Sequence, residues 1–467
     1  MGNARGLAAI FGQDEFLRSV EMVRKIVLPI AVALLSLSTM AGRCFAQKSE
    51  TDRAIQFFQW KVAQDPDDCF NYDRLGTAYI QKARETGDIA YFDLAAKSLE
   101  KSLALESTHA EAAPATKHLA TVYFSEHRFS EARALALQAL DLNPGDITPN
   151  ALAGDAESEM GNYDRARDFY RRLDNPSNSQ AGNEGILYLQ ETRASSEAFL
   201  NGDTQSSIEH MLRGVEISKR AGLSKESIAW SQFMLGENYF LAGELAKART
   251  AYEDALKTYP GYHRALAGAA KVAAAEGRFS EAIDGYQQAI RVIPLPAYAA
   301  ALGDVYARNG RMEQARKQYD LVEIIGRLTA FNRNVYNREL AVFYADHDIR
   351  LNDAVALARK EFEVRHDVYT WDALAWALYK NGQTEEAAQA MNSALRLGTK
   401  DASIFYHAGL IYDRMGERSK AIEFLNRVEA LNPQFNPLFS EQARQTLQRL
   451  STESTEAANR RSIDAQP

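Results

Sequence analysis

The sequence of 467 residues predicts an all-α fold, a solenoid in which antiparallel helix pairs stack on copies of themselves. One residue pattern returns about every 34 residues, most clearly in the segments 371–394 and 405–433, which are in the same register. Small residues, Ala375 in the first segment and Gly409 in the second, stand at matching positions where two helices must pack closely. The whole chain contains only 12 prolines, as expected for a helical protein.

The two C-terminal copies also share large and small residues at fixed offsets. The first copy has Trp371, Leu374, Ala375, Leu378, Ala387, Met391 and Ala394, and the second has Phe405, Ala408, Gly409, Tyr412, Ala421, Leu425, Val428 and Pro433. This pattern resembles the tetratricopeptide repeat (TPR), which reads W-x2-L-G-x2-Y, then A-x3-F, then P. The resemblance implies a right-handed superhelix and a non-catalytic scaffold that binds protein or peptide partners in a concave groove.

The N-terminal residues 1–46 have the pattern of a targeting segment. Arg24 and Lys25 precede an apolar stretch, residues 26–42, and the small-residue exit Cys44-Phe45-Ala46 follows. Cleavage after Ala46 would give an exported protein of bacterial type, periplasmic or secreted. Without cleavage, residues 26–42 would anchor the chain in the inner membrane. The sequence leaves both alternatives open, and it also leaves open whether Met22 is the true start.

Repeats fill most of the remaining chain. Residues 47–173 predict an N-terminal TPR array that contains Leu75-Gly76 and Leu119-Ala120 at the small-residue crossing. Residues 174–228 predict an irregular loop, rich in Asn, Ser and Gly, and an atypical repeat. Residues 229–436 predict a C-terminal array in which Leu235-Gly236 restores the register. Residues 437–450 predict a capping helix, and residues 451–467 lack apolar periodicity and predict a disordered tail.

Composition and motifs exclude several functions. A formal net charge of −8 argues against a nucleic-acid partner, because phosphate binding needs a basic surface. The eight histidines do not form the HExxH metal motif, and neither a phosphate-binding loop nor a G-x-S-x-G elbow is present. We therefore expect no enzyme, no metal and no cofactor. A glycan- or cell-wall-acting enzyme remains as a minor alternative, and the sequence does not predict the oligomeric state.

The TPR resemblance also implies which residues contact partners, because the first helix of each repeat lines the groove. Transferred to this sequence, that rule gives the partner-binding groove Trp230, Phe233, Glu237, Phe240, Tyr369, Asp372, Trp376, Tyr379 and Tyr406. Aromatic residues beside charged ones are typical of interface hot spots, and acidic positions favour basic partners. Alternatively, aromatic residues at helical spacing pack between neighbouring helices. A membrane-anchored assembly factor of an envelope or polymer-export complex is the second functional hypothesis.

Overall fold

The computed structural model describes residues 49–174, 183–330 and 337–464, and the regular elements in these ranges are all helices. The chain divides into two compact units, Met1–Arg53 and Ala54–Pro467, and the following description concerns the second. The all-α class expected from the sequence is confirmed. The predicted targeting segment, residues 1–46, lies outside the described residues. Among the described residues, no helix is long and apolar enough to cross a membrane.

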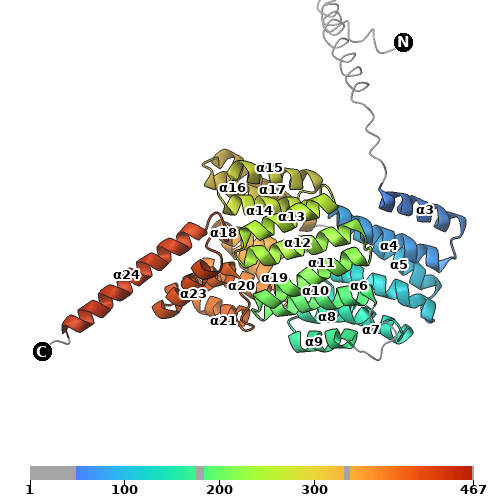
Figure 1. The fold of residues 1–467 in the computed structure, drawn as a ribbon, viewed down its shortest axis with the longest axis horizontal. Coiled ribbons are helices and arrows are strands. Elements are labelled where there is room, and N and C mark those ends of the chain that lie inside the picture. The colour runs from blue at the N-terminus through green and yellow to red at the C-terminus, as the bar shows by residue number, and fades with distance from the viewer. Residues whose placement is uncertain (1–48, 175–182, 331–336, 465–467) are drawn as a thin grey trace, which may run out of the picture. The chain divides into compact units, whose positions relative to one another are not determined.

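The architecture is a succession of antiparallel helix pairs, ten of them in the described ranges, each packed on the next (Figure 1). Helix α3 (Glu50–Gln64) precedes the pairs, α24 (Ser440–Asp464) follows them, and two short 3-10 helices, Ala110–Ala112 and Arg172–Asp174, lie between helices. The pairs are α4 (Cys69–Thr86) with α5 (Ala90–Leu105), α6 (Ala113–Ser125) with α7 (Phe129–Leu142), α8 (Pro149–Glu159) with α9 (Tyr163–Arg171), α10 (Glu184–Leu200) with α11 (Thr204–Arg220), α12 (Lys225–Leu241) with α13 (Leu245–Thr258), α14 (His263–Ala275) with α15 (Phe279–Val292), α16 (Pro296–Arg308) with α17 (Met312–Ala330), α18 (Asn337–Asp346) with α19 (Leu351–Phe362), α20 (Val368–Lys380) with α21 (Thr384–Ala394), and α22 (Ala402–Arg414) with α23 (Arg418–Leu431).

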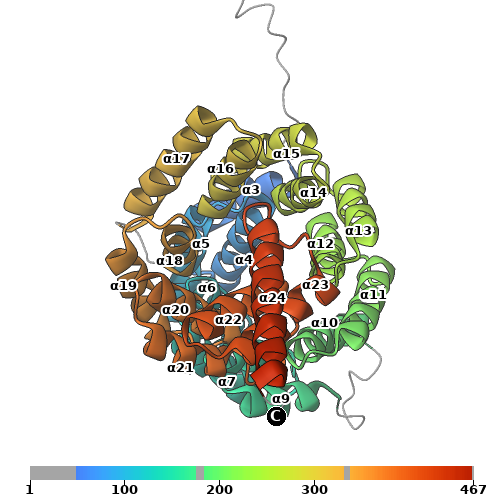
Figure 2. The ribbon, with the colours of Figure 1, turned by 90° about the vertical axis from the view of Figure 1, so that its left-hand side faces the viewer.

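The first and second helices of the pairs occupy different layers. In the end-on view of Figure 2, the first helices α12, α16 and α18 face the middle, and the second helices α13, α17 and α19 lie outside them. The core between the layers is rich in alanine, with Ala248, Ala315 and Ala387 fully buried in three second helices. Alanine has high helix propensity and lets helices approach closely, so the small-residue register of the sequence becomes the packing register of the solenoid.

Besides the packing between neighbouring pairs, parts of the solenoid that are far apart in the sequence also contact each other. The backbone N–H of His366 donates to the carbonyl of Glu159 at 2.9 Å, 207 residues earlier in the chain. Thr399 Oγ1 donates to the carbonyl of Leu200 at 2.6 Å, and Asn432 Nδ2 donates to the carbonyl of Phe240 at 2.9 Å. Since these contacts advance in parallel along both segments, one superhelical turn stacks on the next. We call this region the inter-turn interface.

Three turn glycines make the inter-turn interface possible. Gly161, Gly202 and Gly243 have φ angles of 76°, 74° and 76°. Each is so close to the other turn that a Cβ would overlap a carbonyl oxygen there, that of His366, Gly398 and Leu431 respectively. Glycine is needed here both for the left-handed backbone and for the close approach.

Buried charges also cross the inter-turn interface. Arg365, 7% exposed, lies with Nε 2.7 Å from Glu159 Oε2 and Nη1 3.4 Å from Glu361 Oε1. His127 Nδ1 lies 3.6 Å from the same Glu361 oxygen. Burial lowers the pKa of His127 to about 3 and raises the pKa of Glu159 to about 7. His127 is therefore neutral at physiological pH, and Arg365 is the cation that contacts both Glu159 and Glu361 at this interface.

Two segments lie where the sequence predicts irregular structure. In the region 174–228, where the sequence predicts an irregular loop and an atypical repeat, helices α10 and α11 form a pair of 17 residues each, and residues 175–182 lie outside the described residues. The tail predicted to be disordered over 451–467 is helical to Asp464 in α24. Glu453 pairs with Arg418 at 2.6 Å and with Arg449 at 3.3 Å, so ion pairs extend a helix that has little apolar periodicity.

Candidate partner-binding groove

Two cavities open among the first helices of the pairs. The acidic cavity, about 380 Å³, is lined mainly by α16, α18, α20 and α22 and by the segment before α24. The aromatic cavity, about 460 Å³, is lined mainly by α8, α10 and α12. Tyr369 at the start of α20 lines both cavities, so we treat them as two compartments of one inner groove.

A repeated tyrosine contact orients carboxylates of the first helices. Tyr170, Tyr252 and Tyr319 each donate a hydroxyl hydrogen bond to a carboxylate 15 residues earlier, at 3.0, 2.6 and 3.0 Å. The acceptors are Asp155, Glu237 and Asp304, and the residue just before each of them is a glycine. A Cβ on any of these glycines would overlap the tyrosine ring. Glycine, carboxylate and tyrosine thus form one unit that fixes an acidic side chain in three separate repeats.

Replacing Gly303 with alanine tests this unit. We expect Gly303→Ala to displace the Tyr319 ring from Asp304 and to lower the free energy of unfolding by about 1–3 kcal/mol, the usual cost of overpacking. Urea unfolding measures the effect. The control is Gly214→Ala in α11, where the nearest atom to a new Cβ is Thr192 Cγ2 at 3.5 Å, so stability should not fall. Equal effects of the two substitutions would contradict the proposed steric role of Gly303.

The acidic cavity combines carboxylates with aromatic and aliphatic surface. Its charged and titratable lining residues are Asp304, Arg338, Glu339, Asp346, His347, Asp372, Asp401 and His407. Phe343, Ile404, Phe435 and Phe439 provide much of its apolar wall. Arg338 Nη1 lies 3.0 Å from Asp367 Oδ2, outside the cavity lining, so five carboxylates share a space with one engaged arginine.

Hydrogen bonds hold these carboxylates in place. His347 Nε2 lies 2.9 Å from Asp304 Oδ1, His407 Nδ1 lies 2.9 Å from Asp372 Oδ1, and Trp376 Nε1 donates to Asp346 Oδ1 at 2.7 Å. Burial raises the pKa of Asp346 to about 6, although Trp376 and the two histidines act against this shift. Burial disfavours protonated His347 and His407, but the neighbouring aspartates more than compensate and raise the pKa of both imidazoles.

The aromatic cavity combines large apolar side chains with charged groups, among them Asp155, Glu159 and Asp367. Phe199, Met211, Trp230 and Met234 line it together with the polar side chains of Arg193 and Asn238. Arg193 Nη2 lies 2.5 Å from Asp155 Oδ2, so its charge is compensated. Methionine and aromatic side chains adapt to varied apolar partners, and this compartment therefore suits a bulky apolar side chain.

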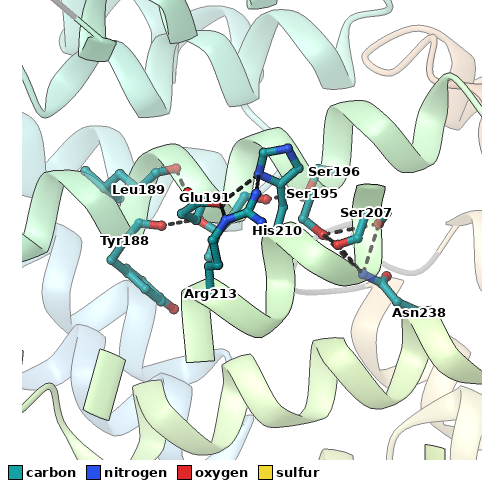
Figure 3. Close-up of polar contacts among 10 residues, drawn as sticks. Tyr188, Leu189, Glu191, Ser195, Ser196, Ser207, His210, Arg213 and Asn238 are labelled. Atoms are coloured by element: carbon teal, nitrogen blue, oxygen red, sulfur yellow. Dashed lines mark hydrogen bonds and ion pairs between the residues drawn. The ribbon is translucent and has the colours of Figure 1, made fainter. Parts of the chain in front are cut away.

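A polar cluster borders the aromatic cavity on α10, α11 and α12 (Figure 3). Asn238 Nδ2 donates to Ser195 Oγ at 3.1 Å and to Ser207 Oγ at 3.0 Å. His210 Nδ1 lies 2.7 Å from Glu191 Oε2. The cluster contains the residue types of a serine hydrolase, but among the described residues no hydrogen bond joins His210 to either serine. Ser195 and Ser207 are buried, and their bonds tie three helices together.

The structure separates the nine residues predicted to contact partners. Trp230 lines the aromatic cavity, Asp372 lines the acidic cavity, and Tyr369 lines both. The other six do not line these two cavities, and they pack against neighbouring helices or pair with neighbouring side chains.

Three of those six are almost fully buried. Trp376 is 1% exposed and stacks on His407 with a centroid distance of 4.1 Å, and Tyr406 is fully buried and donates to Gln442 Oε1 at 2.9 Å. Phe240 is 4% exposed, in a cluster with Ala248 and Val272. These side chains are buried among the helices that form the groove and do not line either cavity.

The remaining three are half-buried. Phe233 packs against Tyr252 and Tyr262, and Glu237 pairs with Lys271 at 2.7 Å. Tyr379 stacks on Trp376 and is covered by Arg414, whose guanidinium carbon lies 4.9 Å from the ring centroid. Contact of these residues with a partner stays a prediction.

Sequence reasoning missed Asp304, Asp346, His347 and His407. One signal was available for Asp304, because a glycine precedes it and Tyr319 follows 15 residues later, as in two other repeats. The other three belong to the cavity because α18, α20 and α22 converge, which no local pattern reveals. Among the described residues, no group of three His, Cys, Asp or Glu side chains could hold a metal ion.

Residues 233–299 and 373–434 match the family model described as Tetratricopeptide repeat. These two segments therefore carry the tetratricopeptide repeat pattern. The matched segments include the second half of α12, most of α20 and all of α22, which line the two cavities.

One curated relative is the Protein CTR9 homolog of Arabidopsis thaliana, 27% identical over 198 residues, which cover 40% of this chain and 17% of that protein. Solved structures include the APC/C hetero-tetramer Cut9-Hcn1, with 16% identity, a TM-score of 0.34, and coverage of 89% of this chain and 98% of the other. Another is yeast Tom70, with 13% identity, a TM-score of 0.31, and coverage of 85% and 98%. A third is the P58(IPK) TPR domain, with 15% identity, a TM-score of 0.27, and coverage of 91% and 98%.

Proposed function

We propose that this chain is a non-catalytic scaffold that holds a basic peptide or protein segment in the inner groove. The observation that supports this most directly is the pair of cavities meeting at Tyr369, because both combine apolar surface with carboxylates and one of them is lined by five carboxylates. An extended or helical segment could place an apolar side chain in one compartment and follow the groove into the other. A role as scaffold also agrees with the repeats, whose stacked helices form a long surface.

Site-specific crosslinking tests the proposal. Short random peptides are selected against the full chain, and p-benzoylphenylalanine then replaces either Tyr369 in the groove or Lys257, an exposed residue of α13. We expect the selected peptides to crosslink at position 369 and not at position 257. Failure to select any peptide, or crosslinking at position 257 alone, would contradict the proposed groove function.

The proposal extends to localisation. We propose that residues 1–46 direct export, on the basis of Arg24, Lys25 and the apolar stretch that follows them. N-terminal sequencing of the mature protein from a bacterial host should give Gln47 as the first residue. Recovery of a membrane-bound chain that still contains residues 26–42 would instead support the membrane-anchored assembly factor. Recovery of an uncleaved chain free of the membrane would contradict both.

A further inference from the structure

The acidic cavity contains carboxylates whose charge no fixed cation compensates. Asp304 has an ion-pair partner in His347, whose Nε2 lies 2.9 Å from Asp304 Oδ1. Asp346 accepts from Trp376 at 2.7 Å and Asp401 accepts from Tyr369 at 3.2 Å, and these two donors are neutral groups of the wall. A neutral donor orients a carboxylate but leaves its charge in place, so Asp346 and Asp401 can still bind a positive group of a ligand.

A second feature is a ring nitrogen of His407 that has no hydrogen-bond partner among the described residues. The His407 side chain is 7% exposed, and its Nδ1 is occupied by Asp372. With the proton on Nδ1, the other ring nitrogen, Nε2, is an acceptor, and it has no hydrogen-bond partner among the described residues. His407 lines the cavity, and Asp372 occupies the opposite nitrogen, which leaves Nε2 for a ligand that donates an N–H.

The cavity wall can also hold the stem of a long cationic side chain. Phe343, Phe435 and Phe439 line the cavity beside the carboxylates. Lysine and arginine bury their aliphatic stems on such apolar surface while the charged end remains in polar surroundings. Aromatic faces additionally attract the cation itself.

We infer that the acidic cavity is a subsite for one lysine or arginine side chain of the segment bound in the groove, with Asp346 and His407 Nε2 beside its charged end. This inference depends on the proposed groove function and adds to it the residue type at one position of the partner. The aromatic cavity then takes an apolar residue of the same segment.

The charges around Asp346 predict how binding depends on pH. The charged and titratable residues that line the cavity with Asp346 come from four helices. They are Asp304 on α16, Arg338 and Glu339 on α18, His347 just after α18, Asp372 on α20, Asp401 at the N-cap of α22, and His407 on α22. Asp346 has a pKa raised to about 6, and the pKa values of both histidines are raised as well. Below about pH 6 the aspartate loses its charge, and the two histidines, whose pKa values are raised, have already gained theirs at higher pH. Both changes oppose a bound cation, so affinity should fall as the pH falls.

The test compares one selected peptide with an analogue in which norleucine replaces its basic residue, using fluorescence anisotropy and the full chain. We expect basic residues to be enriched at one peptide position and the norleucine analogue to bind about tenfold or more weakly, as for a lost hydrogen-bonded charge. Asp346→Asn, which keeps an acceptor for Trp376 Nε1, should remove most of this difference. Asp284→Asn, the same charge change at an exposed position of α15, should leave it unchanged.

Thermal denaturation of Asp346→Asn shows whether it remains folded; removal of a buried charge should not lower its stability. Peptides selected without any basic preference, or a basic preference that Asp346→Asn and pH 5 leave intact, would overturn the subsite and leave the groove function standing. If no peptide is selected, the proposed function itself fails.

Discussion

Replacing Trp376 with alanine is expected to lower the free energy of unfolding by about 3–5 kcal/mol, the usual cost of truncating a buried tryptophan. Trp376 is 1% exposed and contacts Tyr379, Tyr406, His407 and Phe439, which belong to three different segments. The substitution also removes the Nε1 donor of half-buried Asp346. The lost packing of the indole ring and the lost hydrogen bond to Asp346 both destabilise the fold at the contact between two repeats.

Urea unfolding followed by circular dichroism measures this effect. Trp376→Phe is the matched control, because it retains most of the ring volume and loses the hydrogen bond, and it should lose clearly less stability. A loss below about 1 kcal/mol for Trp376→Ala would contradict the structural role, since such values are usual for surface substitutions. The sequence predicts that Trp376 contacts the partner. A binding defect of Trp376→Ala alone would not show such a contact, because the same substitution is expected to destabilise the wall of the groove.

The second large effect concerns the inter-turn interface. We expect Gly243→Ala to cost about 2–4 kcal/mol, because a side chain at φ 76° is strained and its Cβ would overlap the Leu431 carbonyl oxygen. The nearby bond from Asn432 Nδ2 to the Phe240 carbonyl should weaken with it. Thermal denaturation gives the stability, and small-angle X-ray scattering shows whether the turns separate.

Gly416→Ala is a matched control for Gly243→Ala. Gly416 has the same φ of 76° at the end of α22, but nothing lies within 4 Å of a Cβ placed there. It should therefore show only the backbone cost, about 1–2 kcal/mol. If both variants lose the same stability and neither changes its scattering, the turns do not depend on close approach at Gly243.

Local pattern was sufficient to predict the helix pairs. Ala375 and Gly409 occupy equivalent places in the sequence register, and both are buried at helix crossings in the structure. The pattern was weakest in 174–228, yet α10 and α11 form a regular pair whose crossing is filled by Ser195 and Ser207. Serine can replace alanine or glycine at such a helix crossing when its hydroxyl makes a hydrogen bond. A repeat pattern defined by apolar and small residues does not detect this substitution.

The inter-turn interface and the acidic cavity could not be predicted in this way. His366 meets Glu159, and Thr399 meets Leu200, only because the repeats curve enough to bring residues about two hundred positions apart together. Small rotations at each repeat set that curvature, and no single repeat encodes them. For the same reason the family-derived positions identified Tyr369 and Asp372 as groove residues and missed Asp346 and His407.

Fluorine NMR of the full chain labelled with 5-fluorotryptophan tests the central claim, that the partner lies in the inner groove. The sequence has four tryptophans: Trp230 lines the aromatic cavity, Trp376 holds Asp346 of the acidic cavity, Trp371 packs on Phe362, and Trp60 is 56% exposed on α3. Each resonance is assigned from a Trp→Phe variant. On addition of a selected peptide, the account predicts that the Trp230 and Trp376 resonances shift and that the Trp60 resonance does not. A shift of Trp60 with Trp230 and Trp376 unchanged would contradict it.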